Sequence, residues 1–175
     1  MRKSCLPNVF TFANLSCGVF SLLCTIQKNY LWASIFIILA ALVDRYDGRI
    51  ARFFQVSSEL GKELDSLADL VSFGVAPSIL MFTLYSLNNF GPYGILGYIL
   101  VIAYPICGAF RLARYNVSSF DGVFTGVPIT IAGSIIAIFA LLTFNRVSTM
   151  TMVLGIIFII AFSYLMVSNF KLKKV

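Results

Sequence analysis

The sequence predicts an all-α membrane protein with six transmembrane helices in a single domain that occupies residues 1–175. Hydrophobic residues make up 59% of the chain and charged residues 11%, whereas an ordinary soluble domain is about 45–50% apolar and about 25% charged. The apolar residues are grouped in segments close to the roughly 20 residues that cross about 30 Å of hydrocarbon. Because a backbone in lipid must satisfy its own hydrogen bonds, each segment is expected to be a helix.

The six apolar segments follow one another with short connections. They occupy residues 9–27, 31–54, 64–87, 92–115, 123–144 and 147–170. Connections such as "QKN" and "NRVS" can do little more than reverse the chain, so consecutive helices are expected to be antiparallel neighbours. A short basic start precedes the first segment without a small-residue cleavage site, which predicts a first span rather than a removed signal peptide.

The distribution of basic residues predicts how the protein lies in the membrane. With both termini on one side, that side holds eleven of the thirteen lysines and arginines, and Lys28 and Arg146 lie on the other. Cytoplasmic loops carry the excess of Lys and Arg, so we expect an integral, multi-pass cell-membrane protein with both termini cytoplasmic. The positive charge suits anionic lipid headgroups. Nucleic-acid binding is disfavoured, since the basic residues flank membrane spans.

Four aspartates gather at the predicted cytoplasmic ends of the second and third segments. Asp44 and Asp47 are three residues apart, and Asp65 and Asp69 are four apart. Residues with these spacings share one face of a helix. The reversal between the two segments therefore predicts that two pairs of carboxylates meet across one gap, which makes this cytoplasmic-side gap the candidate active site.

A cluster of carboxylates at the membrane edge needs a compensating cation. A bare charge within the bilayer costs at least ~2.5–3.5 kcal/mol. The sequence has no histidine, and none of its four cysteines forms a C-x-x-C pair. Oxygen ligands without Cys or His favour hard divalent cations such as Mg²⁺, Mn²⁺ or Ca²⁺.

Two interpretations of the acidic cluster that involve no catalysis remain open at this point. The neighbouring Arg45, Arg49 and Arg52 can pair with the acids in a salt-bridge network that binds no ligand. Alternatively, acids within membrane segments often mark ion pathways, which predicts a divalent-cation transporter. The other four segments carry no acid in mid-span, and this disfavours a path across the bilayer.

Small residues beside the acids favour a phosphate-bearing ligand. Gly48 and Ala51 lie three apart on the second segment and leave a bare patch where a ligand can approach the backbone. Arg52 follows and can hold a phosphate group through its planar fork of donors. Carboxylates, a cation, a bare patch and an arginine together predict a site for a nucleotide diphosphate.

The spacing of these residues resembles the signature of a known enzyme family, the CDP-alcohol phosphotransferases. The pattern Asp44-x2-Asp47-Gly48-x2-Ala51-Arg52-x8-Gly61-x3-Asp65-x3-Asp69 matches that signature at all eight fixed positions, over 26 residues. The family's six-span membrane core also agrees with the segments above. The resemblance implies transfer of a phosphatidyl or similar group from a CDP-alcohol to a second alcohol, with release of CMP.

The resemblance also implies roles for individual residues. The four aspartates would hold two divalent cations, Mg²⁺ or Mn²⁺, with Ca²⁺ as a non-productive occupant, and Asp69 would be the catalytic base. Residues of three stretches would contact the CDP-lipid: Pro7, Asn8, Val9 and Phe10; Gly48, Ala51 and Arg52; and Ser58. The resemblance further implies a homodimer.

A second cluster of basic residues bears on the identity of the acceptor alcohol. Arg111 and Arg114 are three residues apart and can meet one anionic group, although a pair of membrane anchors has the same spacing. The stretches "SFGVAPS", "FRLARYN" and "FTGVP" resemble membrane-embedded phosphatidylserine synthases, which implies L-serine. Phosphatidylglycerophosphate and phosphatidylinositol phosphate synthases remain alternatives, because arginines suit their phosphorylated acceptors equally well. The donor, CDP-diacylglycerol or CDP-archaeol, and the roles of Asn116 and Asp121 stay open.

Overall fold

The computed structural model describes the backbone of residues 5–54, 59–117, 123–168 and 171–173, and the side chains of residues 9–46, 59–117 and 126–168. Helices dominate these ranges. The elements are α1 (Cys5–Ile26), α2 (Tyr30–Phe54), α3 (Glu59–Asp69), the π-helical turn η1 (Leu70–Val75), α4 (Ala76–Leu84), the 3₁₀ turns η2 (Leu87–Asn89) and η3 (Pro92–Gly94), α5 (Ile95–Val117), β1 (Val123–Thr125), α6 (Ile129–Thr143), α7 (Thr149–Val167) and β2 (Lys171–Lys173).

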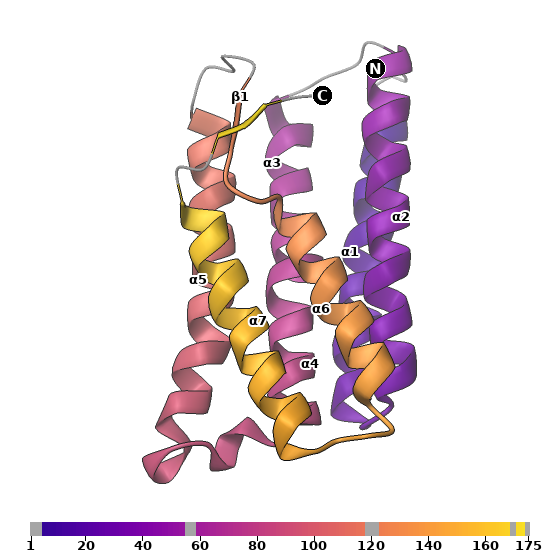
Figure 1. Cartoon of the computed structure of the whole chain (residues 1–175). Helices are drawn as coiled ribbons and strands as arrows, with labels where there is room; N and C mark the ends of the chain where they lie inside the picture. The colour runs from indigo at the N-terminus through magenta and orange to yellow at the C-terminus, as the bar shows by residue number, and fades with distance from the viewer. Residues whose placement is uncertain (1–4, 55–58, 118–122, 169–170, 174–175) are drawn as a thin grey trace.

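The helices lie alongside one another in an up-and-down bundle (Figure 1). The segments α3, η1 and α4 form one continuous rod, since the backbone stays right-handed at Asp69 and Ala76. This rod lies in the middle of the bundle, and 61% of the residues in its most apolar 18-residue stretch are buried, compared with 17–28% in the corresponding stretches of the other long spans. Residues placed on the central rod are therefore surrounded by the other helices.

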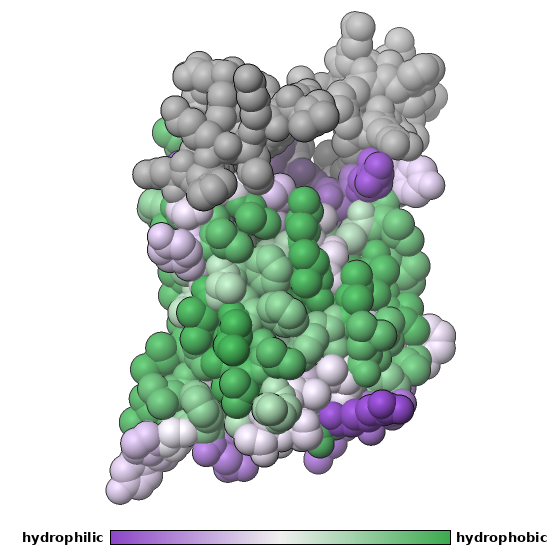
Figure 2. All heavy atoms as spheres, in the orientation of Figure 1, coloured by the Kyte–Doolittle hydropathy of each residue, from purple (hydrophilic) through white to green (hydrophobic). Residues whose placement is uncertain are grey.

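Length and composition identify four helices in the described part of the chain that can cross a membrane. They are Val9–Ile26, Glu59–Leu84, Pro92–Val117 and Thr149–Val167. The helix Ile129–Thr143 is apolar but shorter. Figure 2 shows an apolar belt around the middle of one face, with hydrophilic side chains toward its two ends. The predicted helical class and a membrane-embedded core agree with these features.

The predicted segment 123–144 was wrong at its beginning, because α6 starts only at Ile129. Residues 123–125 form β1 instead, which pairs antiparallel with β2 and adds a small ribbon to the helical fold. Gly126 has a positive φ of 77°, and a side chain there would lie 2.6 Å from the carbonyl oxygen of Met166. This turn, followed by Pro128, separates the strand from the helix. The segment predicted to end at residue 170 has its helix end at Val167.

A close approach between α1 and the central rod positions the side chains described below. Gly18 faces Ser72 of η1, and a Cβ added to Gly18 would lie 2.5 Å from the Ser72 hydroxyl oxygen. The Ser72 hydroxyl in turn donates a hydrogen bond of 2.9 Å to the carbonyl oxygen of Asn14. A glycine is required here because any side chain would separate α1 from η1.

We expect Gly18→Ala to destabilise the fold by about 1–2 kcal/mol. Overpacking a close contact costs about 1–3 kcal/mol, and we expect about 2–3 kcal/mol here because the added Cβ would also lie 2.9 Å from the Ser72 Cα. A gain of about 1 kcal/mol in helix propensity offsets part of this cost. Thermal unfolding in detergent measures the effect. Val19→Ile, which enlarges an exposed side chain on the same helix, is the control, and equal stability of both variants would contradict the tight contact.

Candidate active site

Three of the four predicted metal-binding aspartates meet at one point of the bundle. Carboxylate oxygens of Asp44, Asp65 and Asp69 all lie within 4.8 Å of one another. Asp44 comes from α2, while Asp65 and Asp69 share one face of α3 four residues apart. Asp69 is 8% exposed, whereas Asp44 and Asp65 are half-buried. The predicted meeting of acids from two antiparallel helices is therefore present among the described residues.

These carboxylates fit a hard divalent cation. Three negative groups so close together repel one another strongly unless a positive charge lies among them. They offer only oxygen ligands, the set that suits Mg²⁺, Mn²⁺ and Ca²⁺. The fourth predicted ligand, Asp47, lies on α2 three residues after Asp44. Its backbone position puts it on the Asp44 side of the helix, and its side chain is outside the described residues.

The predicted CDP-lipid contacts are only partly within the described structure. Gly48, Ala51 and Arg52 belong to the last turns of α2, and Pro7 and Asn8 to the first turn of α1, where the structure describes backbone alone. Ser58 lies outside the described residues. The side chain of Val9 is 57% exposed, and that of Phe10 is half-buried. The start of α1 and the end of α2 lie at the same end of the bundle (Figure 1).

Asn14 of α1 contacts Asp69, and this contact was not predicted from the sequence. Its amide nitrogen donates a hydrogen bond of 3.0 Å to a carboxylate oxygen of Asp69. The side chain is 1% exposed. An asparagine inside an apolar helix is itself a signal, because buried polar groups require partners. The sequence does not say, however, which distant residue that partner is.

The two arginines that were predicted to bind the acceptor lie within electrostatic range of each other but have different partners. Arg111 is 8% exposed and lies within electrostatic range of Asp69. Arg114 instead donates hydrogen bonds to the carbonyl oxygens of Met166, Val167 and Ser168, at 3.4, 3.1 and 3.4 Å. Arg114 thus satisfies carbonyls at the end of α7. An acceptor role stays a prediction for both arginines.

Hydrogen bonds of Asn116 link the end of α5 to α3. Its amide nitrogen donates to the Ser66 hydroxyl at 2.9 Å and to a carboxylate oxygen of Glu63 at 3.3 Å. The Lys62 ammonium donates to the Asn116 carbonyl oxygen at 3.3 Å. These contacts hold the helix of Arg111 against the helix of Asp69. Asp121, whose role the sequence left open, lies outside the described residues.

A groove of about 360 Å³ between α2 and α6 begins at the acidic cluster. Its polar residues include Asp44 and Arg45 from α2, with Thr130 and Ser134 from α6. The remaining lining is apolar: Ala41, Ile131 and Ile135. A molecule with a charged head and a hydrocarbon tail matches such a lining.

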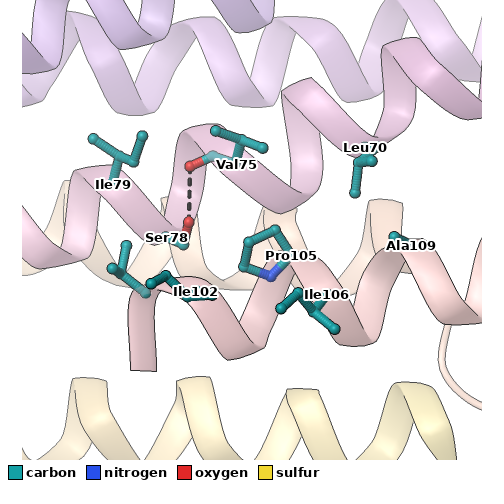
Figure 3. A pocket seen from close by; sticks show the side chains of 9 residues that line it. Leu70, Val75, Ser78, Ile79, Ile102, Pro105, Ile106 and Ala109 are labelled. Atoms are coloured by element: carbon teal, nitrogen blue, oxygen red, sulfur yellow. Dashed lines mark hydrogen bonds between the residues drawn. The ribbon is translucent and has the colours of Figure 1, made fainter. Parts of the chain in front are cut away.

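A second groove, of about 380 Å³, lies between α5 and the central rod (Figure 3). Its single hydroxyl belongs to Ser78 and donates to the carbonyl oxygen of Val75 at 2.9 Å. The other lining side chains are apolar: Leu70, Val75, Ile79, Val101, Ile102, Pro105, Ile106 and Ala109. With no charged group in its lining, this groove suits hydrocarbon rather than a nucleotide.

The amino-acid sequence is similar to those of known proteins. The CDP-alcohol phosphatidyltransferase family matches residues 4–162. A CDP-diacylglycerol–serine O-phosphatidyltransferase of Bacillus subtilis is 36% identical over 95% of this chain and 88% of its own length. One of Helicobacter pylori is 34% identical over 94% of this chain and 70% of its own length. The archaetidylserine synthase of Methanothermobacter thermautotrophicus is 35% identical over 97% of this chain and 70% of its own length. The aspartate cluster therefore stands in a protein that belongs to the CDP-alcohol phosphatidyltransferase family.

Proposed function

We propose that this enzyme transfers the phosphatidyl group of a CDP-linked lipid to the hydroxyl of L-serine and releases CMP. The observation that carries the proposal is that the carboxylate of Asp69 lies close to those of Asp44 and Asp65 and within electrostatic range of the buried Arg111. The similarity to serine phosphatidyltransferases and to archaetidylserine synthase supports serine as the acceptor. The donor is CDP-diacylglycerol or CDP-archaeol.

The proposed chemistry is a displacement at the β-phosphorus. Two divalent cations, Mg²⁺ or Mn²⁺, held by Asp44, Asp47, Asp65 and Asp69, would neutralise the pyrophosphate and the charge that develops as CMP departs. Asp69 accepts the proton of the serine hydroxyl, whose oxygen forms a bond to the β-phosphorus. The bond from this phosphorus to the bridging oxygen breaks, and that oxygen leaves with CMP. A carboxylate takes the role of base because the chain has no histidine.

The donor's two ends match different parts of the molecule. The groove between α2 and α6 joins Asp44 and Arg45 to Ile131 and Ile135. We propose that the lipid's glycerol region and one acyl chain occupy this groove, with the pyrophosphate at Asp44. The cytidine then extends toward the end of α2, where the predicted contacts Gly48, Ala51 and Arg52 lie.

The number of membrane crossings and the orientation of the protein in the membrane are likewise proposals. Six crossings, with both termini and the active site at the cytoplasmic face, agree with the bundle and with the basic residues. In Figure 1, α2 and α5 end and α3 begins at the end of the bundle where the termini are marked, and these parts of the helices carry Arg45, Lys62, Arg111 and Arg114. The connections α1–α2 and α6–α7, which carry Lys28 and Arg146, lie at the other end. Lys28→Cys and Lys62→Cys, each made in a variant whose four native cysteines are replaced by serine and then labelled with a membrane-impermeant reagent, test this arrangement. Residue 62 protected and residue 28 labelled in intact cells is the expected pattern.

We also propose a homodimer, as the family resemblance implies. Chemical cross-linking in membranes tests it, and a single-chain species at every cross-linker concentration argues against it.

Purified enzyme with a CDP-lipid, Mn²⁺ and a panel of acceptors tests the reaction. CMP release with L-serine, and with neither glycerol 3-phosphate nor inositol phosphate, is the expected result. Release with a phosphorylated acceptor instead would assign one of the other synthases. No release with any acceptor, together with metal flux in vesicles, would favour the cation transporter.

Removal of divalent cations is expected to lower CMP release by at least about a thousandfold, because the metal supplies several kcal/mol of charge stabilisation. Treatment with EDTA followed by titration of Mg²⁺, Mn²⁺ or Ca²⁺ measures this dependence. Recovery with Mg²⁺ or Mn²⁺ and weak recovery with Ca²⁺ is the expected order. Full activity in EDTA would contradict a metal role for the aspartates.

A further inference from the structure

The orientation of the Asn14 amide leaves its oxygen facing away from Asp69. A carboxylate accepts hydrogen bonds, so the amide nitrogen must be the end that faces Asp69. That contact is 3.0 Å long. The amide oxygen is buried and has no hydrogen-bond partner among the described residues. Because a buried acceptor without a partner is costly, this oxygen is a candidate contact for a bound molecule.

A second buried group in the same neighbourhood is also without a partner. The Nε atom of Arg111 is buried and makes no hydrogen bond within the described structure. Arg111 comes from α5, Asn14 from α1, and Asp69, the residue that both adjoin, from α3. Three helices thus direct a hydrogen-bond acceptor, a cation and a proton-accepting carboxylate to one region.

Among the side chains that the structure describes, the two other buried atoms without partners lie elsewhere. They are the hydroxyl oxygens of Ser21 and Tyr104. Each is seven residues from Asn14 or Arg111 on its own helix, which is about 10 Å along the axis. A hydroxyl can rotate to find a donor or an acceptor, so neither atom indicates a particular ligand.

We propose that Asn14 binds the ammonium group of the acceptor and thereby selects an amino-acid alcohol, an inference that rests on the proposed function. The amide oxygen accepts from the ammonium, Arg111 pairs with the carboxylate, and the hydroxyl faces Asp69. Serine carries its ammonium and its hydroxyl on adjacent carbons. The Asn14 nitrogen contacts Asp69, and the Asn14 oxygen would bind the serine ammonium. The serine hydroxyl is therefore brought close to the carboxylate of Asp69.

The same contact discriminates against phosphorylated acceptors. Glycerol 3-phosphate and inositol phosphate have no ammonium group, so the strongest donor that they can offer the Asn14 oxygen is a neutral hydroxyl. A hydrogen bond from an ionised donor is roughly twice as strong as one from a neutral donor, so the Asn14 oxygen favours the acceptor that carries an ammonium group. Arg111 alone attracts a phosphate and a carboxylate alike, so Asn14 is the residue that separates the two classes.

The test compares L-serine with 3-hydroxypropanoate, which has the hydroxyl and the carboxylate but no ammonium. We expect Asn14→Leu to lower the ratio of kcat/KM for serine to that for 3-hydroxypropanoate by about 10- to 100-fold. The KM for the CDP-lipid should change by less than about threefold. Equilibrium binding of labelled L-serine to the CDP-bound enzyme should weaken by a similar factor. This gives a readout that does not depend on turnover.

Two further variants make the result specific. Ser21→Ala removes another buried oxygen from α1 and should leave the acceptor ratio unchanged. Asn14→Ala removes both ends of the amide without adding a side chain as large as leucine, so it should lose discrimination as Asn14→Leu does, even if the leucine variant fails to fold.

Three outcomes would overturn the proposal. Equal losses with serine and with 3-hydroxypropanoate would mean that Asn14 only positions Asp69. If the substitution of Asn14 raised only the KM for the CDP-lipid, Asn14 would belong to the binding site of the donor instead. No CMP release by the unsubstituted enzyme with serine would instead reject the proposed function itself, and the acceptor panel above detects that failure separately.

Discussion

Asp69→Asn is expected to lower the turnover number by about 10²–10⁴-fold, the range that a positioned general base contributes. The amide cannot take the proton of the serine hydroxyl, yet its oxygen can still accept the hydrogen bond that the Asn14 nitrogen donates in the native protein. The affinity for the CDP-lipid should therefore stay close to that of the unsubstituted enzyme. Rapid measurement of CMP release, together with binding of a labelled CDP-lipid, separates the two quantities.

Glu63→Gln is the matched control for this prediction. Glu63 lies on α3 as Asp69 does, is exposed, and accepts a hydrogen bond from Asn116 rather than from Asn14. The same change from carboxylate to amide should leave turnover nearly unchanged there. Normal turnover of the Asp69 variant would remove Asp69 as the base, while loss of lipid binding would assign it to the donor site alone.

Arg111→Ala is expected to raise the KM for serine by about 30-fold or more, since truncating one partner of a buried charge pair costs about 2–5 kcal/mol. The reason is that Arg111 is buried beside Asp69, where we propose that it pairs with the acceptor's carboxylate. The KM for the CDP-lipid should change much less. Steady-state kinetics with each substrate varied in turn measure both values.

Arg114→Ala separates the acceptor role from an anchoring role. Its guanidinium contacts the carbonyls at the end of α7, so its removal should lower the unfolding temperature more than it raises the KM for serine. An equal rise in the KM for serine in the two variants would mean that both arginines bind the acceptor, as their spacing in the sequence first suggested. Equal effects of Arg111→Ala on both substrates would contradict an acceptor role for Arg111.

The sequence by itself determined the helical membrane class and the position of the acidic cluster. Apolar segments of membrane-spanning length leave the backbone no alternative to helices. The spacing of Asp65 and Asp69 puts both on one face of a helix whatever the surroundings are. A short reversal between α2 and α3 then suffices to bring Asp44 to the same point, and this convergence of three carboxylates was predictable.

Only the tertiary structure decided which side chains complete the site. Asn14 and Asp69 are 55 residues apart, and their contact depends on the close approach of α1 to η1 that Gly18 permits. Arg111 and Arg114 have equivalent spacing in the sequence, but one is buried beside Asp69 and the other contacts the end of α7. The ribbon of β1 and β2 likewise joins segments that are distant along the chain. The physical reason is that helix periodicity acts within one element, whereas partners between elements depend on packing that no local pattern encodes.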